Sequence, residues 1–599
     1  MPTSATEYPS ARDSTGAQKR SKATAARSLT ARICPGSDNS GENSWLLPLE
    51  QSLVVGFFAL LLFPLLYLAR ELDNNVLTSW QWTIARENFA FFFLAFCILV
   101  LTVFVVAKNI PLEKIGHPLL ALLAFLVVVP MWIAPEMMLD SGRYFLQARY
   151  LTEHGLVAFI RQWGRGIWVW TDLPLSAILY GLVERYASSA RLACQVFNTL
   201  LFSGAVLLTS AVGGLLWERR IGKTAGLLLL ASPFLLSQAP QFLNDLHVMF
   251  FLVLYLYCLL RLQQDQGKIW HYFCPCSATL LFLSKYSVWP VIFLLPLLVL
   301  LAGYQKKMHH QPKTYWTCGA TLLIIGGIFF VFREVFLAQI HLLRTYQADG
   351  LHSWRENYIS TYLFQTHPFV TLTAGLGIVA ALRRRDPKIL VIAWFPFYAL
   401  LLSMARSRYL IPFFPLLALL AAYGLEEVKE IVIRRQIVAT AVLFSLLIAY
   451  GAYLPFFRET SMMNLKLAGE YLDTLDDNTF IVHTAPQHKS KGATRAAIPI
   501  LALYTDKTLL LDDDLSPPDR LPAGFTYPLQ FTQSMPLTSF SAAQEEDGRP
   551  SIFIGDETLA KDNRHSTGNG EAFSRRTGVF RYQTLVKIST TESPFPPGR

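Results

Sequence analysis

The sequence predicts a polytopic α-helical membrane protein with a small C-terminal extracytoplasmic α/β domain. Hydrophobic residues make up 53% of the 599 residues and charged residues only 16%, whereas roughly 25% is usual for a globular chain. The mean hydropathy is +0.35. Several apolar runs approach or exceed the roughly 18 residues needed to cross a bilayer. These observations exclude a purely soluble enzyme, a fibrous chain and a disordered chain.

Residues 1–45 are predicted to form a disordered cytoplasmic tail. They are rich in Ser, Thr, Ala and Arg and show no apolar period. The first apolar run begins near Leu53, which is too far from the N-terminus for a cleavable signal peptide. Four basic residues favour a cytoplasmic tail, and they are Arg20, Lys22, Arg27 and Arg32.

Residues 46–455 are predicted to form a transmembrane domain of about thirteen helices, counted from the apolar runs. The runs lie near residues 51–69, 88–106, 116–134, 192–214, 224–240, 246–261, 270–284, 287–303, 317–336, 366–382, 389–405, 409–425 and 437–454. No internal repeat is visible at this level.

The loops between these spans predict the orientation in the membrane. With a cytoplasmic N-terminus, the alternation of spans gives four inner loops that are all basic or contain basic clusters, as the positive-inside rule predicts. The C-terminus then lies outside. The net charge of +10 therefore reports topology, and no nucleic-acid-binding motif accompanies it. The inner loops are 217–223, the loop with Lys306 and Lys307, 383–388 and 426–435.

Three regions are expected on the outer side. The first outer loop, 135–191, carries Trp163, Trp168 and Trp170, which suit an interfacial position. Within it, Arg143–Leu156 and Leu175–Tyr186 have helical spacing and are expected to lie on the membrane surface. The second is the loop 337–365. The third is the C-terminal domain, 456–599, with a predicted helix at 464–472 and predicted strands at 479–484, 508–511, 551–554 and 578–588.

Asp140 is the most informative polar residue. It follows the third predicted span on the outer side, where a carboxylate can take a proton from a hydroxyl. The alternative is that Asp140 only caps the helix that begins near Gly142, because Asp is a favoured N-cap. Asp245 lies in a tight outer turn, and it too can be either a functional carboxylate or only a helix cap. His247 adds a titratable neighbour, but a lone His at a membrane edge is weak support.

Three basic residues also lie where cations are unexpected. Lys285 interrupts an apolar stretch, and a lysine at membrane depth is costly and often functional, although snorkelling to the interface would also explain it. Arg406 and Arg408 lie on the outer side, against the positive-inside rule, so an anion such as a lipid phosphate is expected to compensate them. Without any nucleotide-binding motif, a lipid-phosphate donor suits this pattern better than a nucleotide sugar.

Taken in order, these residues resemble the GT-C membrane glycosyltransferases, in the branch of the protein O-mannosyltransferases and the aminoarabinose (lipid A) transferases. The resemblance runs from Pro135 to Gly424, and the arginine-led helix 408–419 is its most specific piece. The family often has two adjacent acids where this chain has Asp140-Ser141. The matching segments are 140–148, 172–176, 219–222, 244–245, 284–285 and 408–419.

The resemblance implies a donor and a set of roles. The donor would be a polyprenyl-phosphate sugar, and the acceptor would be a hydroxyl of a glycolipid, polysaccharide or protein. The reaction would take place on the outer face, where the hydroxyl would attack the anomeric carbon of the sugar and invert its configuration. Asp140 would be the general base, and Lys285, Arg406 and Arg408 would bind the lipid phosphate. No cofactor is implied, although a divalent metal is compatible, and a bacterial inner membrane is favoured. The pocket around the reacting groups would be formed by Arg143, Tyr144, Asp172 and Asp245.

Two other classes are open. A secondary transporter or flippase of lipid-linked or small solutes would fit a multi-pass chain, but such proteins tend to show paired repeats and broken helices near the midplane. Here the polar residues gather on one side of the membrane instead. A non-catalytic scaffold whose C-terminal domain binds a partner is the remaining class, and it applies if Asp140 has no role in chemistry.

Overall fold

A computed structural model provides the architecture. The chain divides into two compact units, Met1–Gln51 and Ser52–Arg599, and apart from residues 46–51 the features discussed below belong to the second unit. The predicted tail and the loop with Lys306 and Lys307 lie outside the described residues. The structure describes residues 46–85, 89–137, 140–187, 190–264, 267–305, 312–347, 356–460, 462–484, 494–511, 541–542, 549–555, 571–574 and 585–589.

Eight helices in this described part are long and apolar enough to cross a membrane, and each coincides with a predicted span. In chain order, the helices of these spans are α2 (Leu46–Leu68), α3 (Phe89–Asn109), α7 (Ala190–Leu216), α10 (Asp245–Gln263), α12 (Trp289–Gln305), α13 (Pro312–Val331), α19 (Phe414–Gly424) and α20 (Ile431–Ile448).

The other five predicted spans are helices that are shorter or broken, so the count of thirteen stays a prediction. The length of an apolar run shows how many apolar residues follow one another. It does not show where a proline ends one helix and starts the next. Pro130, Pro233 and Pro396 each lie in the first turn of the segment that follows a break. The five are α4 (His117–Leu126) with η3 (Val129–Ile133), α8 (Arg219–Leu229) with α9 (Pro233–Gln238), α11 (Trp270–Phe282), α16 (Pro368–Arg384), and η7 (Pro387–Val391) with α17 (Phe395–Leu401).

Glycines let two helix pairs pack with their backbones in contact. A Cβ on Gly424 of α19 would overlap the carbonyl oxygen of Thr373 on α16, and one on Gly377 would overlap that of Leu420. Gly213 of α7 and Gly222 of α8 meet in the same way. Small residues at such crossings are typical of membrane helices, because lipid provides no hydrophobic drive and association depends on close packing.

Three of the four predicted inner loops converge on one end of the helices. Arg220 pairs with Glu426, and Arg384 pairs with Glu427 at 2.5 Å. The Trp217 indole donates to Asp386 at 2.8 Å. The span Ser407–Glu427 has 21 residues and is about 31 Å long at 1.5 Å per residue. Arg408 therefore lies at the opposite end of this span from the basic loops, as the predicted topology requires.

The first outer loop is built from two helices. They are α5 (Asp140–Gln162), which is interrupted at Gly155 by a φ of 82°, and α6 (Pro174–Glu184). Glycine at that position relieves the strain of a positive φ. The second outer region contains α14 (Arg333–Leu342) and the π-helical turns η5 (Leu343–Gln347) and η6 (Ser360–Gln365).

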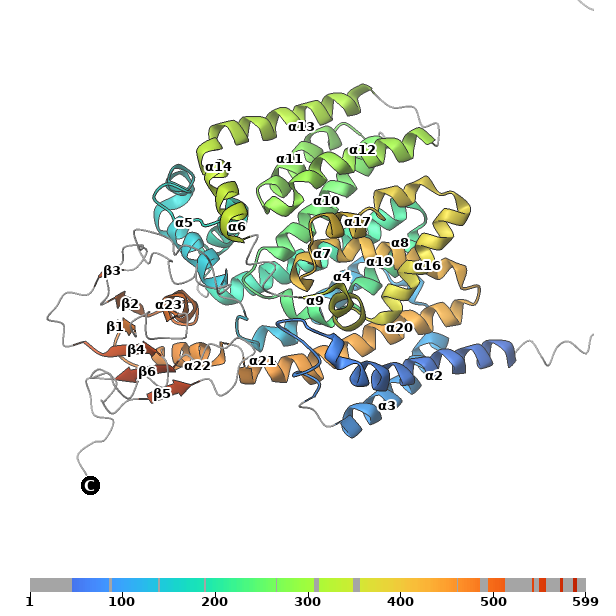
Figure 1. Ribbon diagram of the computed structural model, residues 1–599, viewed down its shortest axis with the longest axis horizontal. Coiled ribbons are helices and arrows are strands. Elements are labelled where there is room, and N and C mark those ends of the chain that lie inside the picture. The colour runs from blue at the N-terminus through green and yellow to red at the C-terminus, as the bar shows by residue number, and fades with distance from the viewer. Residues whose placement is uncertain are drawn as a thin grey trace, which may run out of the picture. The chain divides into compact units, whose positions relative to one another are not determined.

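A six-stranded mixed sheet follows the last span, together with α22 and α23 (Figure 1). Its strand order is β3-β2-β1-β4-β6-β5. Neighbours among β3, β2, β1 and β4 pair in parallel, and β6 pairs antiparallel with both β4 and β5. The predicted helix and strands are confirmed within the described residues, and α23, β3 and β5 were not predicted. The division at residue 456 and an extracytoplasmic location stay predictions. The elements are α21 (Leu454–Thr460), α22 (Met463–Leu472), β1 (Thr479–Thr484), α23 (Thr494–Ala502), β2 (Thr508–Leu511), β3 (Ser541–Ala542), β4 (Ser551–Gly555), β5 (Glu571–Ser574) and β6 (Leu585–Ser589).

The crossing of α16 and α19 gives a test of the packing. We expect Gly424→Ala to lower the unfolding free energy by about 1–3 kcal/mol, the usual effect of overpacking, because the new methyl group has no space. Gly375→Ala on α16 is the matched control, since nothing lies within 4 Å of its Cβ position. Thermal unfolding of the two variants in detergent would measure the difference. Equal stability of both variants would contradict the close crossing.

Candidate functional site

Polar residues from distant parts of the sequence meet at the end of the helices that lies away from the basic loops. They surround a cavity of about 390 Å³. Five charged side chains line it, two acidic and three basic, so the lining carries one excess positive charge. They are Asp140, Arg143, Asp172, Lys285 and Arg408, and Tyr144, Tyr286 and Tyr409 complete much of the wall.

Arg408 is the centre of this cluster. It precedes η8 (Ile411–Phe413) and α19 and is only 3% exposed. Its Nη1 lies 2.5 Å from an oxygen of Asp140, and its Nε bonds to Asp245. One guanidinium therefore joins the start of α5 to the start of α10. A buried charge of this kind is tolerated only when its partners neutralise it and accept its hydrogen bonds.

Asp245 lies behind the cavity wall and pairs with two of the three phosphate-binding candidates, Lys285 and Arg408. Its second oxygen accepts a hydrogen bond from Lys285 Nζ at 2.6 Å. Lys285 lies in the break between α11 and α12, and its Nζ is 4.6 Å from the centre of the Tyr409 ring. Lys285 thus points into a polar cluster and is 19% exposed. This placement favours the functional interpretation over simple snorkelling.

Arg143 connects the carboxylates of Asp140 and Asp172. Its Nε and Nη2 form a bidentate pair with Asp172 at 2.8 and 3.0 Å, and its Nη1 lies 2.7 Å from Asp140. Gln339 of α14 donates to the Asp172 carbonyl at 3.0 Å and accepts from the Tyr286 hydroxyl at 2.5 Å. The second outer region is thereby attached to the first.

Asp140 is the first residue of α5, and its carboxylate faces Arg143 and Arg408. Burial raises the pKa of the Asp140 carboxyl, but the charges of these two arginines outweigh burial and hold the pKa well below its usual range. Asp140 is therefore ionised at neutral pH and can accept a proton. Its basicity is weak while both arginines are in place.

Arg406 and His247 have surroundings that differ from those of the other candidates. Arg406 is absent from the described lining of the cavity, and its Nε lies 3.7 Å from Glu356. His247 is buried between Ser176 and Asn198, at 2.9 and 3.2 Å. Both ring nitrogens thus have partners, which favours the structural interpretation of this histidine.

Three buried carboxylates near the site were not singled out from the sequence. Asp73 accepts hydrogen bonds from the Ser360 hydroxyl at 2.6 Å and from the Gln365 amide at 3.0 Å. Glu356 accepts one from the Ser407 amide at 2.8 Å. These bonds join the segment after α2 to η6 and to the start of the Arg408 helix. A polar loop residue gives no signal of burial, so only the tertiary structure identifies them.

Glu136, the third of them, joins three parts of the chain. Its Oε2 accepts from the Ser141 hydroxyl and the Phe242 amide, both at 3.1 Å, and its amide donates to the Tyr504 hydroxyl at 2.7 Å. Burial raises the pKa of Glu136, and the nearby Arg191 opposes that effect. The residue is linked at once to α5, to the turn before Asp245 and to the C-terminal region.

No group of three or more His, Cys, Asp or Glu side chains in the described part of the chain could hold a metal ion. The three site aspartates instead contact Arg143, Lys285 and Arg408. The expectation about cofactors stays a prediction.

The shared guanidinium gives a stability test. We expect Arg408→Met to cost about 3–5 kcal/mol of unfolding free energy, because it leaves buried carboxylates without their counter-charge. Adding Asp245→Asn should restore part of that loss, since it removes one of those charges. Arg384→Met is the matched control, because its pair with Glu427 is exposed and is worth about 0–1 kcal/mol. Additive losses in the double variant, measured by unfolding in detergent, would contradict the coupling.

Comparison with known proteins gives one partial sequence match. Residues 174–329 match the sequence profile of the dolichyl-phosphate-mannose-protein mannosyltransferases. This stretch contains Asp245 and Lys285 but ends before Arg408. No curated protein sequence matches the chain.

Solved structures give broader matches. The crystal structure of ArnT from Cupriavidus metallidurans bound to undecaprenyl phosphate has a TM-score of 0.51 and 13% identity, covering 80% of this chain and 98% of ArnT. The apo form of ArnT has a TM-score of 0.46 and 12% identity, covering 78% and 97%. The archaeal oligosaccharyltransferase AglB from Archaeoglobus fulgidus, in complex with an inhibitory peptide and a dolichol-phosphate, has a TM-score of 0.41 and 12% identity, covering 73% and 69%.

The match to ArnT bound to undecaprenyl phosphate extends over nearly all of that chain, and at this identity it establishes the fold. Together with the partial profile match, it confirms the resemblance inferred from the sequence. The protein is a multi-pass membrane protein with the fold of the GT-C glycosyltransferases.

Proposed function

We propose that the protein is a membrane glycosyltransferase that moves a sugar from a polyprenyl-phosphate donor to an acceptor hydroxyl at the cavity around Arg408. The observation that carries the proposal is the sharing of the buried Arg408 guanidinium between Asp140 and Asp245 beside Lys285. It combines a proton acceptor and two cations in one cavity at the end of a membrane span. The ArnT structure bound to undecaprenyl phosphate supports the donor class.

The cations suit the leaving group. When the bond between the sugar and the phosphate breaks, the phosphate keeps the electron pair and gains negative charge. Lys285 and Arg408 line the cavity and can form charge-assisted hydrogen bonds to phosphate oxygens. Stabilising charge where it develops is usually the largest contribution to such catalysis. We assign the phosphate to these two residues and give Arg406 a supporting position beside Glu356.

Asp140 would accept the proton of the attacking hydroxyl. The hydroxyl oxygen forms a bond to the anomeric carbon on the face opposite the phosphate, which inverts the configuration, and its proton goes to the Asp140 carboxylate. A phosphate that draws Arg408 away would remove part of the charge that lowers the pKa of Asp140. Donor binding would thereby make Asp140 a stronger base.

The finer assignments follow from the sequence. We place the cavity on the outer face because the basic loops lie at the opposite end of the spans. The basic N-terminal tail and the family resemblance favour a bacterial inner membrane. The transferred group would be a hexosyl or a pentosyl unit. The reaction as proposed needs no cofactor, and a divalent metal would be compatible with the two acids in the cavity wall.

The conservative change Asp140→Asn tests the proposal. We expect sugar transfer to fall on the order of 10²–10⁴-fold, the usual contribution of a positioned proton acceptor, because Asn keeps the size of Asp but not its basicity. The assay supplies a radiolabelled polyprenyl-phosphate sugar to membranes that contain the protein and its acceptor, and it measures the new glycosidic product. Asp476→Asn, which changes an exposed acid in the C-terminal region, is the control.

Two outcomes of this assay would contradict the proposal. Near-wild-type transfer by well-folded Asp140→Asn protein would remove Asp140 from the reaction. Movement of the labelled lipid between leaflets of proteoliposomes without any glycosidic product would favour a flippase instead.

A further inference from the structure

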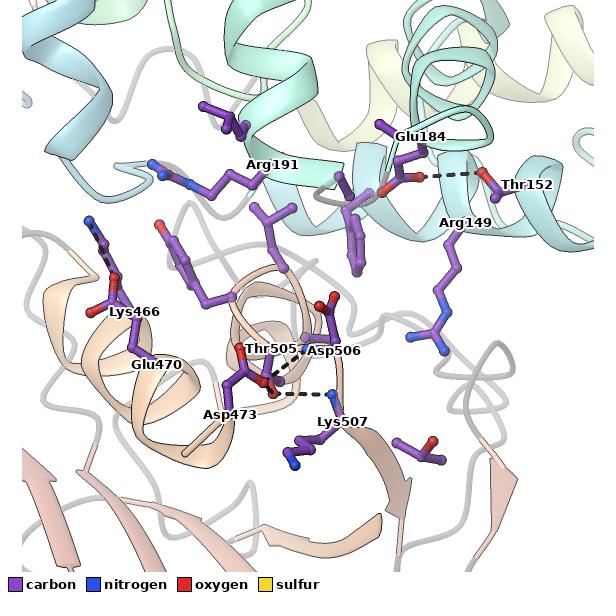
Figure 2. Close-up of a pocket in the computed structure, with 18 of the residues that line it drawn as sticks. Arg149, Thr152, Glu184, Arg191, Lys466, Glu470, Asp473, Thr505, Asp506 and Lys507 are labelled. Carbon is purple, nitrogen blue, oxygen red and sulfur yellow. Dashed lines mark hydrogen bonds and ion pairs between the residues drawn. The ribbon is translucent and has the colours of Figure 1, made fainter. Parts of the chain in front are cut away.

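A second cavity, of about 550 Å³, lies between the first outer loop and the C-terminal region. Figure 2 shows α5, α6 and α7 on one side, with Arg149, Thr152, Glu184 and Arg191, and the C-terminal elements on the other. The Arg149 side chain extends from α5 into the space between the two walls. The proposed reaction does not use this cavity.

The two cavities lie on opposite sides of α5. Asp140, Arg143 and Tyr144 of this helix face the Arg408 cavity. Phe145, Arg149 and Thr152 line the second cavity. At 3.6 residues per turn these two sets project from opposite faces of one helix. Each cavity is therefore a separate binding space that shares α5 as a wall.

The lining of the second cavity is polar and nearly balanced in charge. Four basic and five acidic side chains line it, together with Thr152, Gln195 and Thr505. Part of this wall is already fixed, since Asp473 accepts hydrogen bonds from the Thr505 hydroxyl at 2.5 Å and from the Asp506 amide at 3.1 Å. Rigid donors and acceptors of this kind provide specificity at low entropic cost.

The polar lining of the second cavity determines which class of ligand fits it. An apolar chain would leave charged groups desolvated without partners, which is costly. A phosphate would face a majority of carboxylates, in contrast to the cationic lining around Arg408. A neutral polyhydroxylated ligand satisfies both kinds of group, because each hydroxyl donates one hydrogen bond and accepts others. The chemistry that fits is a saccharide.

We propose that the second cavity binds a saccharide portion of the acceptor, remote from the hydroxyl that reacts. This inference rests on the proposed function and names the acceptor class as an oligosaccharide or polysaccharide chain. Phe145 and Thr152, which line the second cavity, lie 5 and 12 residues after Asp140, which corresponds to about 8 and 18 Å along the helix at 1.5 Å per residue. Because the two cavities also lie on opposite faces of α5, an acceptor that reaches both must be longer than one sugar unit.

Glu136 provides a physical connection between the two cavities. Tyr504 lines the second cavity, and its hydroxyl accepts from the Glu136 amide. The Arg191 guanidinium lies 4.9 Å from the Tyr504 ring centre and 3.6 Å from Glu136. The Glu136 carboxylate in turn bonds to Ser141, the neighbour of Asp140. A ligand in the second cavity thus contacts residues that hold the start of α5.

Filling the cavity tests the proposal. We expect Ala190→Trp, which places an indole among the lining residues, to raise the KM for long glycan acceptors about tenfold or more, the effect of losing one or two hydrogen bonds. The acceptor probe is the glycolipid fraction of the host membrane, used intact and after enzymatic trimming to the lipid-proximal sugar. The KM for the trimmed probe and the slow release of sugar from the donor to water should not change.

Two further variants support this test. Tyr186→Trp is the matched control, because Tyr186 is 84% exposed and absent from the described lining. Arg149→Met removes a cation from the cavity through a partly exposed side chain and should show the same acceptor defect if Ala190→Trp does not fold. An unchanged KM for the intact probe in a folded cavity variant would overturn the inference, as would exclusive transfer to polypeptide. If wild-type protein does not consume the donor, the proposed function fails instead.

Discussion

The shared guanidinium of Arg408 is the interaction on which the site depends. A charge that is 3% exposed must be neutralised where it lies, and its two partners come from helices more than a hundred residues apart in the sequence. Asp140 and Asp245 can meet Arg408 only if α5, α10 and the segment that leads into η8 and α19 converge. The cost of leaving these charges unpaired therefore ties the geometry of the site to the fold of the membrane helices.

The pairing of Arg408 with the two aspartates also suggests how the site is held before the substrate binds. Before a donor binds, Asp140 is ionised but is a weak base, and Arg408 is held by carboxylates. In the proposed reaction, the donor phosphate would compete for the guanidinium as an additional anion, so donor binding would also activate the base. The buried acids around the cluster hold its supports in place. Glu356 bonds to the residue before Arg408, and Glu136 bonds to the residue after Asp140.

Much of this arrangement could be predicted from the sequence because it follows from local patterns. Apolar runs located the eight long spans, and short runs rich in strand-forming residues located strands 479–484 and 508–511 with their observed bounds. Misplaced charges marked Asp140, Lys285 and Arg408 individually. Their partners could not be predicted, since pairing depends on contacts between distant segments. The placement of Arg406 beside Glu356 and the burial of Asp73 and Glu136 could not be predicted for the same reason. Three of the five shorter spans needed knowledge of where prolines break a helix.

The most direct test of the account is a structure of the protein with polyprenyl phosphate bound in a lipid nanodisc. The account predicts phosphate oxygens within hydrogen-bond distance of Lys285 Nζ and the Arg408 guanidinium, with the contact between Arg408 and Asp140 opened. Arg143 should keep its bidentate pair with Asp172, because that pair holds the other side of the cavity. A phosphate bound elsewhere, or one that leaves Arg408 on Asp140, would contradict the central claim.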